Sequence, residues 1–176
     1  MPLRDNKISA NQIIKKLHLA PLKEEGGMYA QTYISNISIP KKCLPRQYCT
    51  DKSIFTQIYF LLNDEEDSFS AMHKLCTDEV YHFYLGDPVE MLLLYPRGKS
   101  RIICLGSNIF KGEKVQFVVP HGVWQGSYIK TGGKFSLMGC SMSPGFDISD
   151  FELGERETLT RLYPEKYDLI NKLTRK

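Results

Sequence analysis

The sequence of 176 residues predicts an all-β fold, an antiparallel β-sandwich or barrel with a short helix near each end. Short runs of branched and aromatic residues alternate with turns of Gly, Pro, Asn and Ser. These turns are too short for crossover helices, so the strands that they join must be antiparallel. Helical spacing of apolar residues occurs only near the two ends. The expected strands are 54–62, 80–85, 89–95, 101–105, 115–119, 125–130 and 134–142.

The helices are expected at about 9–19 and 155–174, on either side of a barrel core at about 25–153. Ser9 is a suitable N-cap for the first helix, and Pro164 fits the first turn of the last one. No repeat, low-complexity tract or linker divides the sequence, so the whole chain, residues 1–176, is expected to form a single domain. The helices are expected to cover sheet surface.

Composition limits the expected partners and the compartment. Lys and Arg number 23 against 20 Asp and Glu, and this scattered surplus of +3 does not indicate a nucleic-acid-binding surface. Apolar runs such as 91–95 are far shorter than the ~20 residues of a membrane span. Residues 1–7 lack the apolar core of a secretory signal. Five irregularly spaced cysteines form no Cys-x-x-Cys pair, which indicates reduced thiols. We therefore expect a cytoplasmic protein without nucleic-acid or membrane partners.

Three segments carry side chains suited to chemistry: 70–87, 118–125 and 139–154. In the first segment, His73 and Glu79 lie six positions apart, ahead of an aromatic strand that ends at a glycine turn. Histidine has an ordinary pKa near ~6.5, which suits proton transfer at neutral pH. A neighbouring carboxylate orients the imidazole and raises its basicity. This segment is therefore the candidate site.

These segments resemble the motifs of the cupin superfamily, whose first motif reads Gly-x5-His-x-His-x3–4-Glu-x6-Gly. His73, Glu79 and Gly86 fall on the first histidine, the glutamate and the last glycine of that motif. Pro120 and Gly122 match the second motif, Gly-x5-Pro-x-Gly-x2-His-x3-Asn. The resemblance implies a cupin double-stranded β-helix, or jelly-roll barrel, that encloses a cavity for one small ligand. Further segments are similar to the RmlC-like branch, the deoxysugar-epimerase-like cupins of largely unassigned function: 25–29, 32–33, 58–62, 86–88 and 144–154.

The chain departs from the cupin pattern at positions that hold a metal. Typical cupins surround iron, manganese, nickel or zinc with three imidazoles and one carboxylate. Here Leu75 replaces the second motif histidine and Gln125 the downstream one, which leaves His73, Glu79 and Gln125 as candidate metal ligands. Leucine cannot bind a metal, and an amide oxygen is a poor donor for the softer ions. No cofactor is therefore certain, and a weakly bound divalent ion at these three residues is an open alternative.

In a barrel without a metal, the resemblance to sugar-nucleotide epimerases implies a histidine base, His73, and a tyrosine acid. The candidate phenols are Tyr29, Tyr59, Tyr81 and Tyr128. Side chains alternate along a strand, so Tyr81 faces inward if Glu79 does, and His82 then faces outward. We therefore expect Tyr81 to be the acid, although a β-bulge after Glu79 would reverse this choice. The residues expected to contact the ligand are Tyr29, Thr32, Tyr59, Phe83, Trp124 and Gln125.

The sequence leads to a function hypothesis with two alternatives. The first is an isomerase or epimerase that acts on a small carbohydrate-like ligand, with His73, Glu79 and Tyr81 as catalytic residues. The alternatives are a metal-dependent cupin enzyme and a non-catalytic binding or storage protein. The sequence has no arginine cluster to bind a diphosphate, which argues against a nucleotide-sugar substrate. A homodimer is expected because unpaired sheet edges tend to associate.

Overall fold

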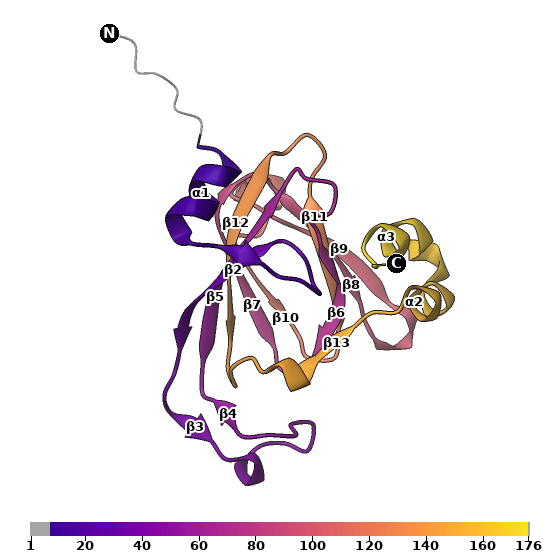
Figure 1. Cartoon of the computed structure of the whole chain (residues 1–176). Helices are drawn as coiled ribbons and strands as arrows, with labels where there is room; N and C mark the ends of the chain where they lie inside the picture. The colour runs from indigo at the N-terminus through magenta and orange to yellow at the C-terminus, as the bar shows by residue number, and fades with distance from the viewer. Residues whose placement is uncertain (1–7, 176) are drawn as a thin grey trace.

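The computed structural model describes residues 8–175, which form two antiparallel sheets that face each other as a jelly roll (Figure 1). All ladders between the named strands are antiparallel, as predicted from the short turns. In spatial order, the six-stranded sheet contains β1 (Ala20–Pro21), β2 (Met28–Ile34), β5 (Thr56–Asn63), β12 (Phe135–Met142), β7 (Glu79–Gly86) and β10 (Gln116–Val119). The five-stranded sheet contains β13 (Phe151–Leu153), β6 (Ser70–Leu75), β11 (Trp124–Ile129), β8 (Val89–Leu94) and β9 (Ser100–Leu105). The all-β prediction is confirmed.

A small arm that the sequence did not predict extends from one end of the six-stranded sheet (Figure 1). It consists of β3 (Ser38–Ile39), a 3₁₀ turn at Lys41–Cys43, and β4 (Lys52–Ser53). The two strands pair over only two residues each. Strands this short show no readable alternation, so the sequence pattern could not predict them.

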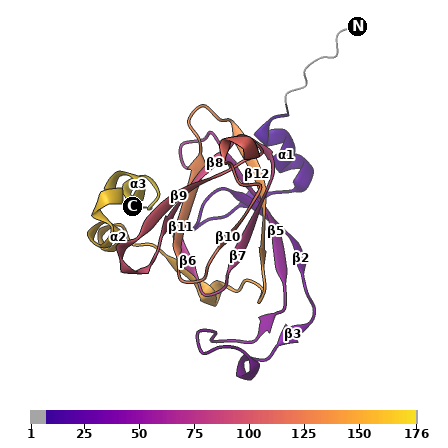
Figure 2. The ribbon, with the colours of Figure 1, turned by 180° about the vertical axis from the view of Figure 1, so that it is seen from behind.

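The helices lie on the outer faces of the two sheets (Figures 1 and 2). The first, α1 (Ala10–Leu17), begins at the predicted N-cap Ser9, which forms a capping box with Gln12. It packs Ile13 against the six-stranded sheet. The helices α2 (Arg156–Leu162) and α3 (Tyr167–Lys172) cover the five-stranded sheet, where Ile170 is fully buried. Pro164 begins the 3₁₀ turn Pro164–Lys166 that joins these two helices.

The interior is packed solid at one end of the barrel and open at the other. The registers of β5, β12 and β7 place Phe60, Met138 and Phe83 at one level, and Thr56, Met142 and Glu79 at another. The first level belongs to the main hydrophobic core. The second level lines a cavity. Alternation selects the inward side chains on each strand, and the level along the strand decides whether they meet core or cavity.

Further 3₁₀ turns occur at Pro96–Gly98, Ile109–Lys111 and Ile148–Asp150. Within residues 8–175, no helix is both long enough and apolar enough to cross a membrane.

Candidate functional site

The cavity at the open end of the barrel has a volume of about 740 Å³, which suits one small molecule. Its walls come from β2, β5, β7 and β12 of one sheet and from β6 and β13 of the other. Two further segments complete it, residues 18–25 and the loop at 146–148. The cavity therefore lies where the two faces of the jelly roll and two loops converge.

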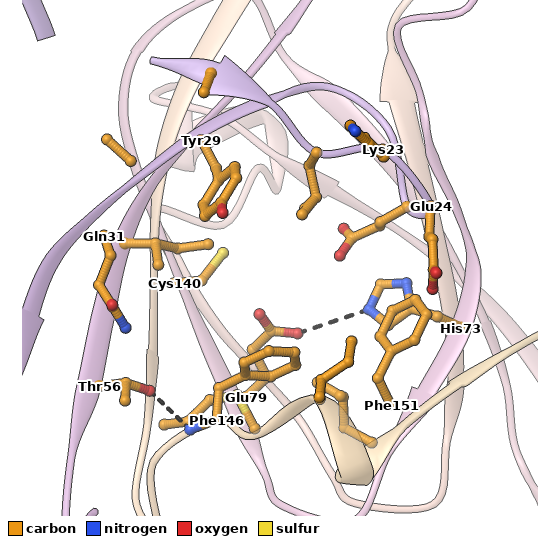
Figure 3. A pocket seen from close by; sticks show the side chains of 18 of the residues that line it. Lys23, Glu24, Tyr29, Gln31, Thr56, His73, Glu79, Cys140, Phe146 and Phe151 are labelled. Atoms are coloured by element: carbon orange, nitrogen blue, oxygen red, sulfur yellow. Dashed lines mark hydrogen bonds and ion pairs between the residues drawn. The ribbon is translucent and has the colours of Figure 1, made fainter. Parts of the chain in front are cut away.

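His73 lies on β6 with only 1% of its surface exposed, and its ring faces the cavity (Figure 3). Its Nδ1 atom is 2.8 Å from the carbonyl oxygen of Ala71. A carbonyl can only accept a hydrogen bond, so Nδ1 carries the hydrogen and Nε2 is the nitrogen that gains or loses a proton. Nε2 lies 4.0 Å from Oε2 of Glu79, beyond hydrogen-bond length, and so stays available to a ligand. On its other side the imidazole stacks on Phe151, with ring centres 5.3 Å apart.

Glu79 is the first residue of β7, and it points into the cavity beside His73 (Figure 3). Gln125 holds it there, because Nε2 of Gln125 donates a hydrogen bond of 2.7 Å to Oε2 of Glu79. Gln125 in turn lies opposite His73 in the β6–β11 ladder. The structure thus brings together the three residues that the two motifs supplied.

Glu25 is a further carboxylate of the site that the sequence analysis did not single out as functional. It lines the cavity, and Oγ of Ser70 donates a hydrogen bond of 2.6 Å to its Oε1. Its carbonyl accepts a hydrogen bond of 2.7 Å from the amide of Ala71, which ties the segment to β6. The next residues, Gly26 and Gly27, have φ values of 104° and 70°, a left-handed backbone that favours glycine. In the sequence, this glycine pair is the feature that could have pointed to Glu25. It predicts a tight turn, and such a turn can bring a neighbouring side chain close to a ligand.

The two carboxylates control the charge of the imidazole. Burial by itself lowers the pKa of His73, but Glu25 and Glu79 outweigh this effect and raise that pKa from 6.5 to about 9. Burial also raises the pKa of Glu25, although the neighbouring His73 opposes the shift. At neutral pH, His73 is therefore an imidazolium that can donate a proton from Nε2.

Tyr81 points inward, as predicted, but it is not among the residues that line the cavity. No bulge interrupts the ladder between Glu79 and Phe83, and Tyr81 points into the barrel. The outward prediction for His82 also holds, since Nε2 of His82 lies 3.1 Å from Oγ of Ser141 on the outer face. However, Tyr81 is 1% exposed and belongs to the solid core below the cavity. The phenol that does line the cavity is Tyr29, on β2 (Figure 3).

Of the other predicted ligand contacts, Gln125 supports Glu79 but does not itself line the cavity, and four lie farther from it. Thr32 and Tyr59 line a groove on the outer face of the six-stranded sheet, beside α1. Phe83 packs against the core. Trp124 lies on the outer face of β11, where it packs with the residues beneath α2 and α3, because its neighbour Gln125 takes the inward position.

Aromatic side chains from the third motif segment form part of the cavity wall that the sequence did not assign. Phe146 lies in the loop after β12 and Phe151 begins β13, and both line the cavity (Figure 3). The loop is tied to the arm and to β5, since the amides of Gly145 and Phe146 donate to Ser53 O and Thr56 Oγ1, at 2.7 and 2.8 Å. A loop without alternation gives no sequence signal for which side chains face a cavity.

Comparison with known proteins identifies the family. The family described as "Cupin superfamily (DUF985)" matches residues 11–154, which is most of the chain. This chain belongs to the cupin superfamily. The structure of protein SO0799 from Shewanella oneidensis is similar, with a TM-score of 0.83 and 34% identity over 96% of this cupin and 98% of that chain. A hypothetical protein from Leishmania major has a TM-score of 0.84 and 29% identity over 96% of this cupin and 100% of that chain.

A yeast protein described as uncharacterized is a further relative. Protein YML079W of Saccharomyces cerevisiae is 31% identical over 116 residues, a match of 63% of this cupin and 57% of the yeast protein. The match thus spans little more than half of the yeast protein's length. The likeness to the RmlC-like branch stays a prediction.

The donor set of this cupin does not fit the metal site that the fold family implies. Leu75 does line the cavity, so the second histidine position faces inward but holds a side chain that cannot bind a metal. Gln125 directs its amide nitrogen, not its oxygen, at Glu79. Among residues 8–175, no three His, Cys, Asp or Glu side chains converge in a way that could hold a metal ion. The polar side chains of the cavity instead form hydrogen bonds with one another and with the main chain.

Proposed function

We propose that this cupin is a proton-transferring enzyme of isomerase or epimerase type that acts on a small carbohydrate-like molecule. The observation that carries the proposal is the orientation of His73, whose Nδ1 is bound to Ala71 and whose Nε2 faces the cavity near two carboxylates. Such a reaction needs a proton donor and a proton acceptor within reach of one substrate. His73 and Glu79 line the cavity side by side, with Nε2 and Oε2 4.0 Å apart, and the phenol of Tyr29 lines it as well.

The charge state of the site assigns the roles within this proposal. His73 is the acid in its resting imidazolium form, and it protonates a substrate oxygen from Nε2. Glu79 is the base, because its carboxylate faces the cavity beside His73. Glu79 removes the proton from a substrate C–H bond next to a carbonyl carbon. The C–H electron pair forms a C=C bond, and the carbonyl π pair moves to the oxygen that His73 protonates. Return of a proton to carbon and loss of the proton from an oxygen of the enol re-form a carbonyl and complete the isomerisation. This assignment reverses the role of base that the sequence suggested for His73.

Hydrogen exchange in D₂O tests the proposal across a range of candidate substrates at once. The purified protein is incubated with a panel of aldoses, ketoses and amino sugars, and carbon-bound deuterium is measured by mass spectrometry. Wild type should incorporate deuterium into at least one compound. His73→Gln should reduce the exchange rate roughly 100-fold or more, the usual contribution of a general acid or base. The rate should also fall as the pH rises through about 9, because the imidazolium is then lost.

His82→Gln is the matched control, since His82 lies on the outer face of β7 and does not line the cavity. It should exchange as fast as wild type. Absence of exchange with the whole panel would contradict the proposal and favour a non-catalytic binding protein. Equal loss in the two variants would show that histidine substitution perturbs the fold, and would contradict a specific role for His73.

A further inference from the structure

We propose that the cavity selects a small molecule with a protonated amine, whose ammonium group binds at the carboxylate of Glu25. The inference rests on the proposed function, because it names the substrate class of the same cavity. It follows from the carboxyl groups of the site, one open acceptor atom and the aromatic wall.

Beyond its mouth, the cavity presents two carboxyl groups and one imidazole, those of Glu25, Glu79 and His73. The exposed Lys23 and Glu24 lie at the mouth. Arg175 donates a hydrogen bond of 3.1 Å to the main-chain carbonyl of Glu25 and does not line the cavity. A carboxylate that faces a partly apolar cavity favours a ligand of opposite charge.

The carboxylate of Glu25 keeps one oxygen available to a ligand. Its Oε1 accepts a hydrogen bond of 2.6 Å from Oγ of Ser70, and no side chain of residues 8–175 donates a hydrogen bond to its Oε2. An ammonium group has three N–H donors and no acceptor, so it can bind this oxygen and keep donors for other acceptors in the cavity. A neutral hydroxyl offers a single donor without the charge. Glu79, whose Oε2 accepts from Gln125, remains the base of the proposed reaction.

The remaining walls suit the body of an aminated molecule. Tyr29, Phe146 and Phe151 present aromatic surface to the cavity (Figure 3). An aromatic ring attracts a cation at its face and also packs against an apolar or sugar-like ring. No arginine is among the described residues that line the cavity. A phosphate or other anion would therefore meet carboxylates without the bidentate partner that such groups usually have.

Three probes of one shape but different charge test the inference: benzylamine, benzyl alcohol and benzoate. Their binding is measured by titration of the NMR resonances of cavity residues at neutral pH. Benzylamine should bind about tenfold more tightly than benzyl alcohol, the effect of one good charge-assisted contact, and benzoate should bind most weakly. Glu25→Gln should reduce the preference for the amine over the alcohol at least several-fold. Glu66→Gln, in an exposed turn outside the cavity, should retain the preference.

Several outcomes would overturn the inference. They are equal or tighter binding of benzyl alcohol or benzoate, an unchanged amine preference in Glu25→Gln, and no response of cavity resonances to benzylamine at about 20 mM, the range of weak fragments. The melting temperature of each variant distinguishes a loss of the folded state from a loss of contact with the probe. Deuterium exchange into a neutral sugar, with no amine preference, would overturn this inference and leave the proposed function intact. An amine preference without any deuterium exchange would contradict the proposed function and leave this inference intact.

Discussion

At the scale of single residues, the site depends on one backbone carbonyl and two carboxylates around His73. The carbonyl of Ala71 decides which ring nitrogen is free, and Glu25 and Glu79 decide its charge. The same imidazole on an exposed strand would be mostly neutral at pH 7. The environment therefore turns a generic histidine into a proton donor.

The pKa of His73 should be about 9, and its ring resonances in an NMR pH titration provide the measurement. Glu25→Gln should lower this pKa, because the substitution removes a neighbouring carboxylate. The control is Glu24→Gln, which should leave the pKa of His73 unchanged because Glu24 is exposed at the mouth. An unchanged His73 pKa in Glu25→Gln would contradict the electrostatic description of the site.

The same shift predicts how stability depends on pH. The pKa of His73 is higher in the folded than in the unfolded state, so its contribution is fully present below about pH 6.5 and is lost as pH rises to about 9. Urea unfolding of wild type and His73→Gln across this window measures the difference. The advantage of wild type over the variant should shrink steadily toward pH 9, and a constant difference would contradict the prediction.

At the scale of elements, a buried ion pair joins the arm to the loop that closes the cavity. Lys52 on β4 has a fully buried side chain, and its Nζ lies 2.8 Å from Oδ1 of Asp150 and 3.5 Å from Oδ1 of Asp147. Between Asp150 and β12, the loop carries Phe146 into the cavity. The arm, which has little core of its own, therefore serves to hold one wall of the cavity.

Lys52→Met should destabilise the fold by about 3 kcal/mol or more, because it leaves the carboxylate of Asp150 buried without its partner. The double variant Lys52→Met, Asp150→Leu should recover most of this loss, since it removes both charges. Urea unfolding at one protein concentration measures both effects. Lys134→Met is the matched control, because it breaks an exposed pair with Asp64 and should cause no clear change. A loss in the double variant as large as in the single one would contradict this account.

At the scale of the whole molecule, the helices cover the two sheets but leave edge strands open. The edges of the sheets are β1 and β10 in one, and β13 and β9 in the other. Val118 on β10 and Ile102 on β9 are each 46% exposed. Open strands with apolar side chains tend to pair with another chain.

We propose on these grounds that the protein forms a homodimer through sheet edges. Light scattering after size exclusion should give twice the chain mass of 20.2 kDa. Val118→Lys should shift the equilibrium toward the monomer, because a charged edge strand resists pairing. Lys42→Ala, in the exposed 3₁₀ turn of the arm, is the control. A mass of one chain at about 100 μM, a concentration where stable dimers persist, would contradict the proposal.

The sequence alone was enough to predict the elements and their directions. Turn residues and the period of two indicated antiparallel strands, and Ser9 marked the start of α1. Alternation correctly turned Glu79 and Tyr81 inward and His82 outward, since it depends only on neighbouring bonds along one strand.

Only the tertiary structure decided which inward side chains reach the ligand. The level of each residue along the barrel is set by the registers between strands and by what fills the interior, so Tyr81 is buried in the core while Tyr29 lines the cavity. Glu25 and His73 are far apart in sequence, and their meeting depends on the hydrogen bonds from Ser70 and Ala71. The charge of His73 follows from that meeting, because a pKa depends on burial and on neighbouring charges that no local pattern encodes.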